Sequence, residues 1–350
     1  GIASFFDPNK SIASGDLIPG KWEEFDRNYK RVLREKEVFD DLAQAMEKSD
    51  VMLIHGNGCM LGNTRIARAQ LFLTYIAKKH FNKAALIVNH TADFDHPELL
   101  RMAQEVYPLF DDVVYRDSIS AQKCQSICHG RVAADTAFLF KPMPLENWAP
   151  VVRRWTYFDV WPDTAWFDPT KPYICIGGSS IYFYNQSVDR LNAFYKLVQH
   201  IQSIYSGQIV LTVSDLRDQE IFRPIAKRFQ LPLIGLSTPV QQSVDILGNA
   251  DAYIGGRWHP GIFALRGGTP VIPISSITFK MEALTRMAGL ASTAFDALNL
   301  EQEIEKIGKQ LLVYLEQGDP LRSKLRNWAE NESKKCSENV AYLHKNRERK

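Results

Sequence analysis

The chain has 350 residues, 45% of them hydrophobic, and a formal net charge of +2 at pH 7. This length is typical of roughly two domains, and the nearly balanced charge argues against nucleic acid as a partner. The sequence has no apolar run of about 18 residues, so we expect no transmembrane helix. The five cysteines, odd in number and widely spread, indicate reduced thiols and therefore favour a cytoplasmic protein.

The first part of the chain alternates short apolar runs with helical periodicity. Strands are expected at 51–54, 84–88 and 112–115, and helices at 35–48, 63–79 and 97–106. The segment 116–120 is expected to open a further helix. Polar turns, at 55–58 and 89–96, are expected to follow the first two strands. This alternation predicts a parallel sheet with helices on both faces.

The segment 141–173 is rich in proline and tryptophan, which is typical of a link between domains. A second α/β series follows it. Its strands are expected at 173–176, 208–213, 233–234, 252–254 and 271–274, and its helices at 188–205, 221–229, 239–248, 260–266, 300–316 and 321–344. The pattern therefore predicts an α/β fold with two Rossmann-like doubly wound domains facing a cleft. We expect an N-terminal domain at 1–150, a link at 151–172, a C-terminal domain at 173–320, and a helix at 321–350 that packs back toward the first domain.

The segment 251–274 is the most informative part of the sequence. It predicts a strand, a short helix and a second strand, with Arg257 and His259 between the first strand and the helix. In an open α/β sheet, that point borders the crevice where ligands bind, and a helix N-terminus attracts anions. We therefore predict a phosphate or carboxylate site with a titratable group beside it. The alternative is that Arg257 caps a neighbouring helix and His259 is a surface turn residue.

Several motifs resemble those of the polysaccharide pyruvyl transferase family, over about residues 50–290. They are the glycine turn His55-Gly-Asn-Gly58, the motif Arg116-Asp-Ser-Ile-Ser120, Asp135, the turn Arg257-Trp-His259, the run Gly268-Thr-Pro-Val-Ile272, and Lys280 before a helix. The resemblance implies a two-domain architecture like that of GT-B glycosyltransferases. It also implies transfer of the enolpyruvyl group of phosphoenolpyruvate to a sugar, usually as a ketal, with no cofactor.

The resemblance and the expected positions together suggest roles for individual residues. His259 is the first candidate for general acid or base, with that choice left open, and Asp93 is the next candidate. The expected donor-binding residues are Arg257, Arg116, Lys280, Ser275, Ser276 and Gly261, and the expected acceptor-binding residues are His55, Asn57 and His90. Arginine suits bidentate carboxylate binding, whereas lysine suits phosphate as a point charge.

Each of these roles has a simpler structural alternative. Arg116 would instead pair with Asp117, Lys280 would be solvated, and the two serines would cap a helix. The histidines and aspartates at 90–96 match no standard zinc spacing, so we expect no metal.

Two other functions compete with pyruvyl transfer. The sequence does not identify the acceptor sugar. One is a GT-B glycosyltransferase that uses a nucleotide sugar, and the other is a sugar-binding protein without activity. The expected partners are phosphoenolpyruvate and a saccharide of a polysaccharide or its precursor, either free or lipid-linked. The basic stretch 334–350 is either a solvated helix face or a contact with an anionic membrane. The expected location is therefore the cytoplasm, either free or peripherally attached to the inner membrane.

Overall fold

The computed structural model describes residues 18–34, 36–152, 160–161, 167–183, 189–291 and 293–347. The chain divides into two compact units. Unit 1 comprises Gly1–Asp135 with Ser337–Lys350, and unit 2 comprises Thr136–Cys336. Most of the expected link, at 153–159 and 162–166, lies outside the described residues. Within the described part of the chain, no helix is both long and apolar enough to cross a membrane.

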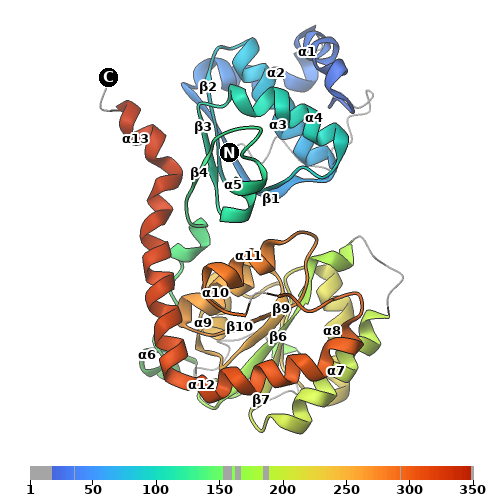
Figure 1. Ribbon diagram of the computed structural model, residues 1–350, viewed down its shortest axis with the longest axis vertical. Helices are drawn as coiled ribbons and strands as arrows, with labels where there is room; N and C mark the ends of the chain where they lie inside the picture. Colours follow the sequence, from blue (N-terminus) through green and yellow to red (C-terminus); the bar gives the residue numbers. More distant parts are fainter. Residues whose placement is uncertain are drawn as a thin grey trace. The chain divides into compact units, whose positions relative to one another are not determined.

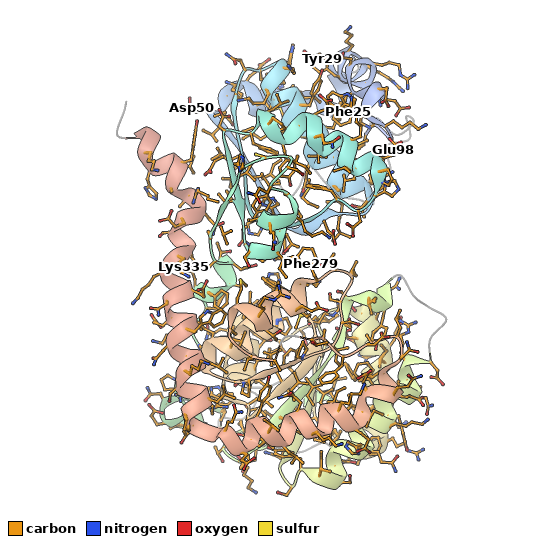
Figure 2. The ribbon with its side chains drawn as sticks, viewed as in Figure 1. Phe25, Tyr29, Asp50, Glu98, Phe279 and Lys335 are labelled. Carbon is orange, nitrogen blue, oxygen red and sulfur yellow. The ribbon has the colours of Figure 1, made fainter. Side chains whose placement is uncertain are left out.

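Unit 1 contains a four-stranded parallel sheet in the order β1-β2-β3-β4 (Figure 1). The strands are β1 (Val51–Leu61), β2 (Ala84–Asp93), β3 (Asp112–Tyr115) and β4 (Arg131–Val132). The helices are η2 (Trp22–Glu24), α1 (Phe25–Arg34), α2 (Lys36–Lys48), α3 (Arg65–Lys79), α4 (Pro97–Val106), η3 (Tyr107–Leu109), α5 (Ser118–Lys123) and α13 (Ala341–Arg347). Phe25 of α1, labelled in Figure 2, is buried. Its ring packs edge-on against Phe72 and Tyr75 of α3. This aromatic contact fixes the N-terminal helix on the core of unit 1.

The first two strands of unit 1 extend beyond the sequence prediction. The expected polar turns at 55–58 and 89–93 belong to β1 and β2, with irregular register between Asn57 and Met60. Two features allow this. Asn57 and Asn89 adopt positive φ angles of 48° and 54°, which asparagine tolerates better than most residues. A Cβ on Gly56 would lie 2.6 Å from the Cβ of His90, so only glycine lets these strands approach so closely.

Unit 2 contains a six-stranded sheet in the order β10-β9-β6-β7-β8-β5, in which only the β5–β8 pair is antiparallel. The strands are β5 (Val160–Trp161), β6 (Tyr173–Ser179), β7 (Gln208–Thr212), β8 (Leu233–Ile234), β9 (Tyr253–Gly256) and β10 (Val271–Pro273). The helices are η4 (Thr136–Leu139), α6 (Leu145–Val152), η5 (Ser180–Phe183), α7 (Arg190–Ile204), α8 (Leu216–Phe229), α9 (Val240–Asn249), α10 (Trp258–Gly267), α11 (Lys280–Met287) and α12 (Leu300–Lys335), and η6 (Cys336–Val340) follows α12.

Two helices of unit 2 differ from the sequence prediction. Helix α8 begins at Leu216, five residues before the expected start at 221, because Asp215 caps it and accepts from the backbone N–H groups of Arg217 and Asp218 at 2.9 and 3.0 Å. The range α12 contains two helices separated by a kink at Gly318 (φ 46°, ψ −136°) just before Pro320, as the sequence predicts, but the second ends at Lys335 instead of continuing to 344.

Candidate active site

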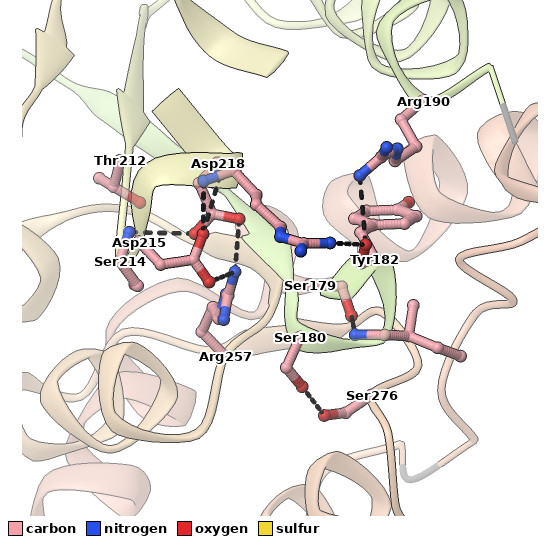
Figure 3. A network of polar contacts seen from close by, with 12 residues as sticks. Ser179, Ser180, Tyr182, Arg190, Thr212, Ser214, Asp215, Asp218, Arg257 and Ser276 are labelled. Carbon is pink, nitrogen blue, oxygen red and sulfur yellow. Dashed lines mark hydrogen bonds and ion pairs between the residues drawn. The ribbon is translucent and has the colours of Figure 1, made fainter. Parts of the chain in front are cut away.

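The carboxyl ends of three neighbouring strands meet in unit 2. Ser179 pairs with Gly256 in the β6–β9 register, and its hydroxyl donates to the Ser275 carbonyl at 2.5 Å. The hydroxyl groups of Ser180 and Ser276 lie 2.6 Å apart, and both residues are buried (Figure 3). Ligands of open α/β sheets bind at this edge. We call this region the unit 2 edge; it comprises residues 179–182, the N-terminal turns of α7, α8, α10 and α11, and residues 275–276.

Arg257 follows β9 at the unit 2 edge and is held by two acids. Its Nη2 donates to Asp215 Oδ2 at 2.5 Å and to Asp218 Oδ1 at 2.7 Å, and its side chain is 14% exposed (Figure 3). Burial opposes its charge, but Asp218 and Asp215 raise the pKa of Arg257. Burial also raises the pKa of Asp218, while Arg257 opposes that shift. Arg257 Nε is buried and has no hydrogen-bond partner among the described residues, so the site contains an unsatisfied donor.

His259 and Lys280 lie in the first turns of helices at the same edge. His259 is the second residue of α10 and Lys280 is the first residue of α11, and both side chains are half-buried. No side chain caps either helix. A lysine at this end of a helix opposes the helix dipole, so its position does not stabilise the helix.

Gly261 does not fit the expected donor-binding role. Its backbone N–H donates to the Arg257 carbonyl at 3.1 Å and is therefore already used within α10. A Cβ at this position would lie 2.7 Å from Leu284 Cδ2 of α11. We therefore infer that Gly261 allows α10 and α11 to pack closely.

Two arginines that the sequence analysis did not single out converge at the unit 2 edge. Arg190 is the first residue of α7 and Arg217 the second residue of α8. The Nη1 atoms of both donate to the Tyr182 carbonyl at 3.2 Å, and both side chains are half-buried (Figure 3). A carbonyl has no charge, so this contact brings two guanidinium groups together without neutralising them. Arg190 directly follows the capping residue Asp189, and Arg217 lies two residues after the capping residue Asp215. An aspartate cap with an arginine in the first helical turn was the sequence signal that could have identified both arginines.

A second set of polar side chains lies in unit 1, within β1 and β2 and in the segments that follow β3 and β4. The unit 1 polar cluster consists of His55, Asn57, Asn89, Arg116 and Asp135. Arg116 Nη1 donates to Asp135 Oδ2 at 2.9 Å and to Asn57 Oδ1 at 2.7 Å. Asn89 Nδ2 lies 2.8 Å from His55 Nε2 and 3.5 Å from Asp135 Oδ1. His55 is exposed, whereas Arg116 and Asp135 are buried.

The burial of Arg116 corrects its expected donor-binding role. Its side chain is 1% exposed, and it also donates from Nε to Thr91 Oγ1 at 2.9 Å. Asp117, the alternative partner from the sequence, instead caps α5 by accepting from Ser120 N at 2.7 Å. Because Nε and Nη1 bind protein groups inside unit 1, we infer that Arg116 organises the polar cluster rather than binding a ligand directly.

His90 is also a structural residue and not an acceptor contact. It is completely buried; Nδ1 lies 2.9 Å from the Val114 carbonyl and Nε2 lies 3.1 Å from the Tyr107 hydroxyl. Burial lowers the pKa of His90 to about 3, so the ring is neutral at physiological pH. Both ring nitrogens are thus engaged inside unit 1.

Asp93, the second catalytic candidate, ends β2 and is mostly buried. Its Oδ1 binds Lys123 Nζ at 2.6 Å, and Lys123 also binds Asp95 at 3.2 Å. Burial raises the pKa of Asp93, and Lys123 opposes that shift. Lys123 occupies only Oδ1 of this carboxylate.

Comparison with solved structures identifies the fold. The S. aureus MnaA structure with UDP has a TM-score of 0.55 at 15% identity, covering 88% of this chain and 77% of that one. The UDP-GlcNAc 2-epimerase from Neisseria meningitidis, bound to UDP-GlcNAc, has a TM-score of 0.53 at 11% identity and covers 87% and 80%. The Arabidopsis thaliana UGT89C1 complex with UDP has a TM-score of 0.51 at 13% identity and covers 91% and 77%. These similarities confirm the predicted α/β, GT-B-like fold class.

Sequence comparison identifies the family. No curated protein sequence matches the chain. Residues 4–277, which are most of the chain, match the family described as polysaccharide pyruvyl transferase. This match confirms the resemblance on which the sequence analysis relied and makes the protein a transferase. The chain therefore belongs to the polysaccharide pyruvyl transferase family.

Proposed function

We propose that the protein transfers the enolpyruvyl group of phosphoenolpyruvate to a saccharide of a polysaccharide or its precursor, forming a pyruvate ketal. The observation that carries this proposal is the meeting of Arg190 and Arg217 at the Tyr182 carbonyl, at the N-terminal turns of two helices. Phosphoenolpyruvate carries a phosphate and a carboxylate close together, and it needs several cationic or N–H donors.

The unit 2 edge supplies these donors in two groups. Arg190 and Arg217 suit the phosphate, assisted by the hydroxyl groups of Ser180 and Ser276. Arg257 suits the carboxylate, because its unsatisfied Nε–H is a donor that a carboxylate oxygen would satisfy. Asp215 joins the two groups, since its carboxylate accepts from Arg257 Nη2 and from the backbone N–H of Arg217. Lys280 and Ser275 belong to the same proposed donor site.

The chemistry requires one proton donor and one proton acceptor. In the proposed reaction, His259 donates a proton to the methylene carbon of phosphoenolpyruvate, which becomes a methyl group. A saccharide hydroxyl then attacks the central carbon and loses its proton to a base. The bond from the central carbon to the phosphate oxygen breaks, and phosphate leaves. A second hydroxyl of the same saccharide then attacks the central carbon and gives its proton to the departing phosphate, which completes the ketal. A histidine is suited to this work because its proton exchanges near neutral pH.

We propose that unit 1 binds the saccharide through His55 and Asn57 of β1. His55 is exposed, and Asn57 is half-buried beside Arg116. Asp93 remains the proposed base, since burial keeps its pKa above the usual range. A lipid-linked saccharide and a free one offer the same sugar oxygens to these residues.

Donor titrations test the proposal. We would measure binding of phosphoenolpyruvate, inorganic phosphate, UDP and UDP-GlcNAc to the unmodified protein and to Arg190→Gln, Arg217→Gln and Arg223→Gln by calorimetry. Phosphoenolpyruvate should bind the unmodified protein and should bind either site variant about tenfold or more weakly, the loss expected for one charged hydrogen bond. Arg223 is an exposed arginine on the same helix as Arg217, so Arg223→Gln is the matched control. If UDP binds and phosphoenolpyruvate does not, the result would instead support a nucleotide-sugar transferase.

A further inference from the structure

A chain of hydrogen bonds in the unit 1 polar cluster begins at a buried ion pair. Arg116 Nη1 and Asp135 Oδ2 are 2.9 Å apart, and both side chains are 1% exposed. Arginine remains protonated in proteins, and a buried guanidinium requires an ionised partner. Asp135 is therefore a carboxylate, and both of its oxygens can only accept hydrogen bonds.

The carboxylate of Asp135 sets the orientation of the Asn89 amide. Asn89 Nδ2 lies 3.5 Å from Asp135 Oδ1 and 2.8 Å from His55 Nε2. In the reversed orientation the amide oxygen would face the carboxylate oxygen, which is repulsive. The amide nitrogen thus faces both neighbours, and it can only donate. His55 Nε2 must accept this hydrogen bond, and it therefore carries no proton.

A neutral imidazole without a proton on Nε2 carries it on Nδ1. His55 lies within β1 and is exposed, and no described residue is hydrogen-bonded to its Nδ1. We propose that Asn89 is a positioning residue that holds His55 in this tautomer, so that His55 presents an N–H donor to an oxygen of the saccharide acceptor. In this form His55 binds the acceptor and does not deprotonate it, which leaves the base to another residue. The identity of the ligand rests on the proposed function; the tautomer does not.

The backbone around Asn89 is held in a way that suits this role. Its positive φ of 54° is accessible to asparagine and glycine but costly for most other residues. The amide oxygen of Asn339 accepts from the backbone N–H of Asn89 at 3.0 Å, and its amide nitrogen donates to the Ala134 carbonyl at 2.9 Å. Asn339 is buried and connects the backbone of Asn89 to the backbone of Ala134, the residue before Asp135.

The tautomer can be measured directly on the unliganded full chain. With ¹⁵N-labelled histidine, the two ring nitrogens of a neutral imidazole have different chemical shifts, and His55→Gln identifies the His55 signals. In the unmodified protein, Nδ1 should be the protonated nitrogen. In Asn89→Gly the backbone can keep its positive φ, because glycine tolerates this conformation. The proton should then move to Nε2, which is the protonated nitrogen in the tautomer that predominates for a free imidazole. Asn57→Gly is the matched control, because Asn57 also has positive φ (48°) and binds Arg116 rather than His55, so the tautomer should not change. Protonated Nε2 in the unmodified protein, or an unchanged tautomer in Asn89→Gly, would overturn the proposal.

A kinetic measurement tests the link to the acceptor. Asn89→Gly should raise the acceptor KM about tenfold, as expected for one misplaced hydrogen bond, and leave the phosphoenolpyruvate KM unchanged. Asn82→Gly, a third residue with positive φ (48°) in the loop before β2, should change neither constant. An equal rise of both constants in Asn89→Gly would refute the positioning role. If the tautomer is as proposed but the protein does not convert phosphoenolpyruvate, the proposed function fails and the assignment of the tautomer stands.

Discussion

Replacing Arg116 with methionine distinguishes the structural role of this arginine from the donor-binding role suggested by the sequence. The change removes the cation that pairs with Asp135 and the hydrogen bonds to Asn57 and Thr91, at a position with 1% exposure. Breaking a buried ion pair on one side costs about 3–5 kcal/mol, because the remaining charge is left without a partner. A loss of this size should lower the melting temperature of a unit of this size by roughly 10 °C.

The assay is thermal and urea unfolding of Arg116→Met, Asp135→Asn and the double variant, followed by circular dichroism. The double variant should recover part of the loss, with a coupling free energy of about 2 kcal/mol or more, since neither charge is then left alone. A donor-binding arginine would behave differently: Arg116→Met would fold normally and bind phosphoenolpyruvate weakly. A stability loss below about 1 kcal/mol, or strictly additive losses, would refute our assignment of Arg116.

Three further predictions concern unit 2. His259→Gln should keep the fold and lower turnover about a hundredfold or more, the usual scale for a lost general acid; near-normal turnover would mean that His259 only positions the donor. Gly261→Ala should destabilise the protein by about 1–3 kcal/mol, because its Cβ would lie 2.7 Å from Leu284 Cδ2, while donor affinity measured by calorimetry stays unchanged. Burial raises the pKa of Asp218 above 3.8, so the folded state keeps this proton at pH values where the unfolded chain has lost it. Stability due to Asp218 should therefore fall as pH rises from about 3.8 through the raised pKa, and Asp218→Asn should flatten this part of a urea-midpoint series against pH.

The local pattern of the sequence was sufficient to predict the elements around Arg257 and His259. An apolar run before them and Pro260 after them predict a strand end and a helix start. Strand β9 ends two residues later than expected, at Gly256, and α10 begins two residues earlier, at Trp258, so that His259 lies inside the helix. The lengths of β1 and β2 were not predictable in this way. Polar residues at 55–58 and 89–93 are typical of turns, but here their side chains find partners in neighbouring strands, and Gly56 makes room for His90.

The site residues that the sequence missed depend on contacts between distant segments. Arg190 and Arg217 are 27 positions apart, and only the parallel pairing of β6 with β7 brings the helices that follow these strands to a common carbonyl. Asn89 likewise gains its role from His55 on β1 and from Asp135, which follows β4. An aspartate cap followed by an arginine in the first helical turn is a usable signal, because the arginine lies at the unfavourable end of the helix dipole.

The two units use their arginines in opposite ways, and this difference supports the assignment of the anionic donor to unit 2. In unit 1, Arg116 is buried against a carboxylate, so the cluster presents hydrogen-bonding groups such as His55 and no net cation. In unit 2, Arg190 and Arg217 share an uncharged carbonyl at helix N-termini. A phosphate is recognised by cationic donors, whereas a saccharide needs directed donors and acceptors more than charge. The neutralised cluster is therefore the one suited to a sugar, and the pair of half-buried arginines is the one suited to phosphoenolpyruvate.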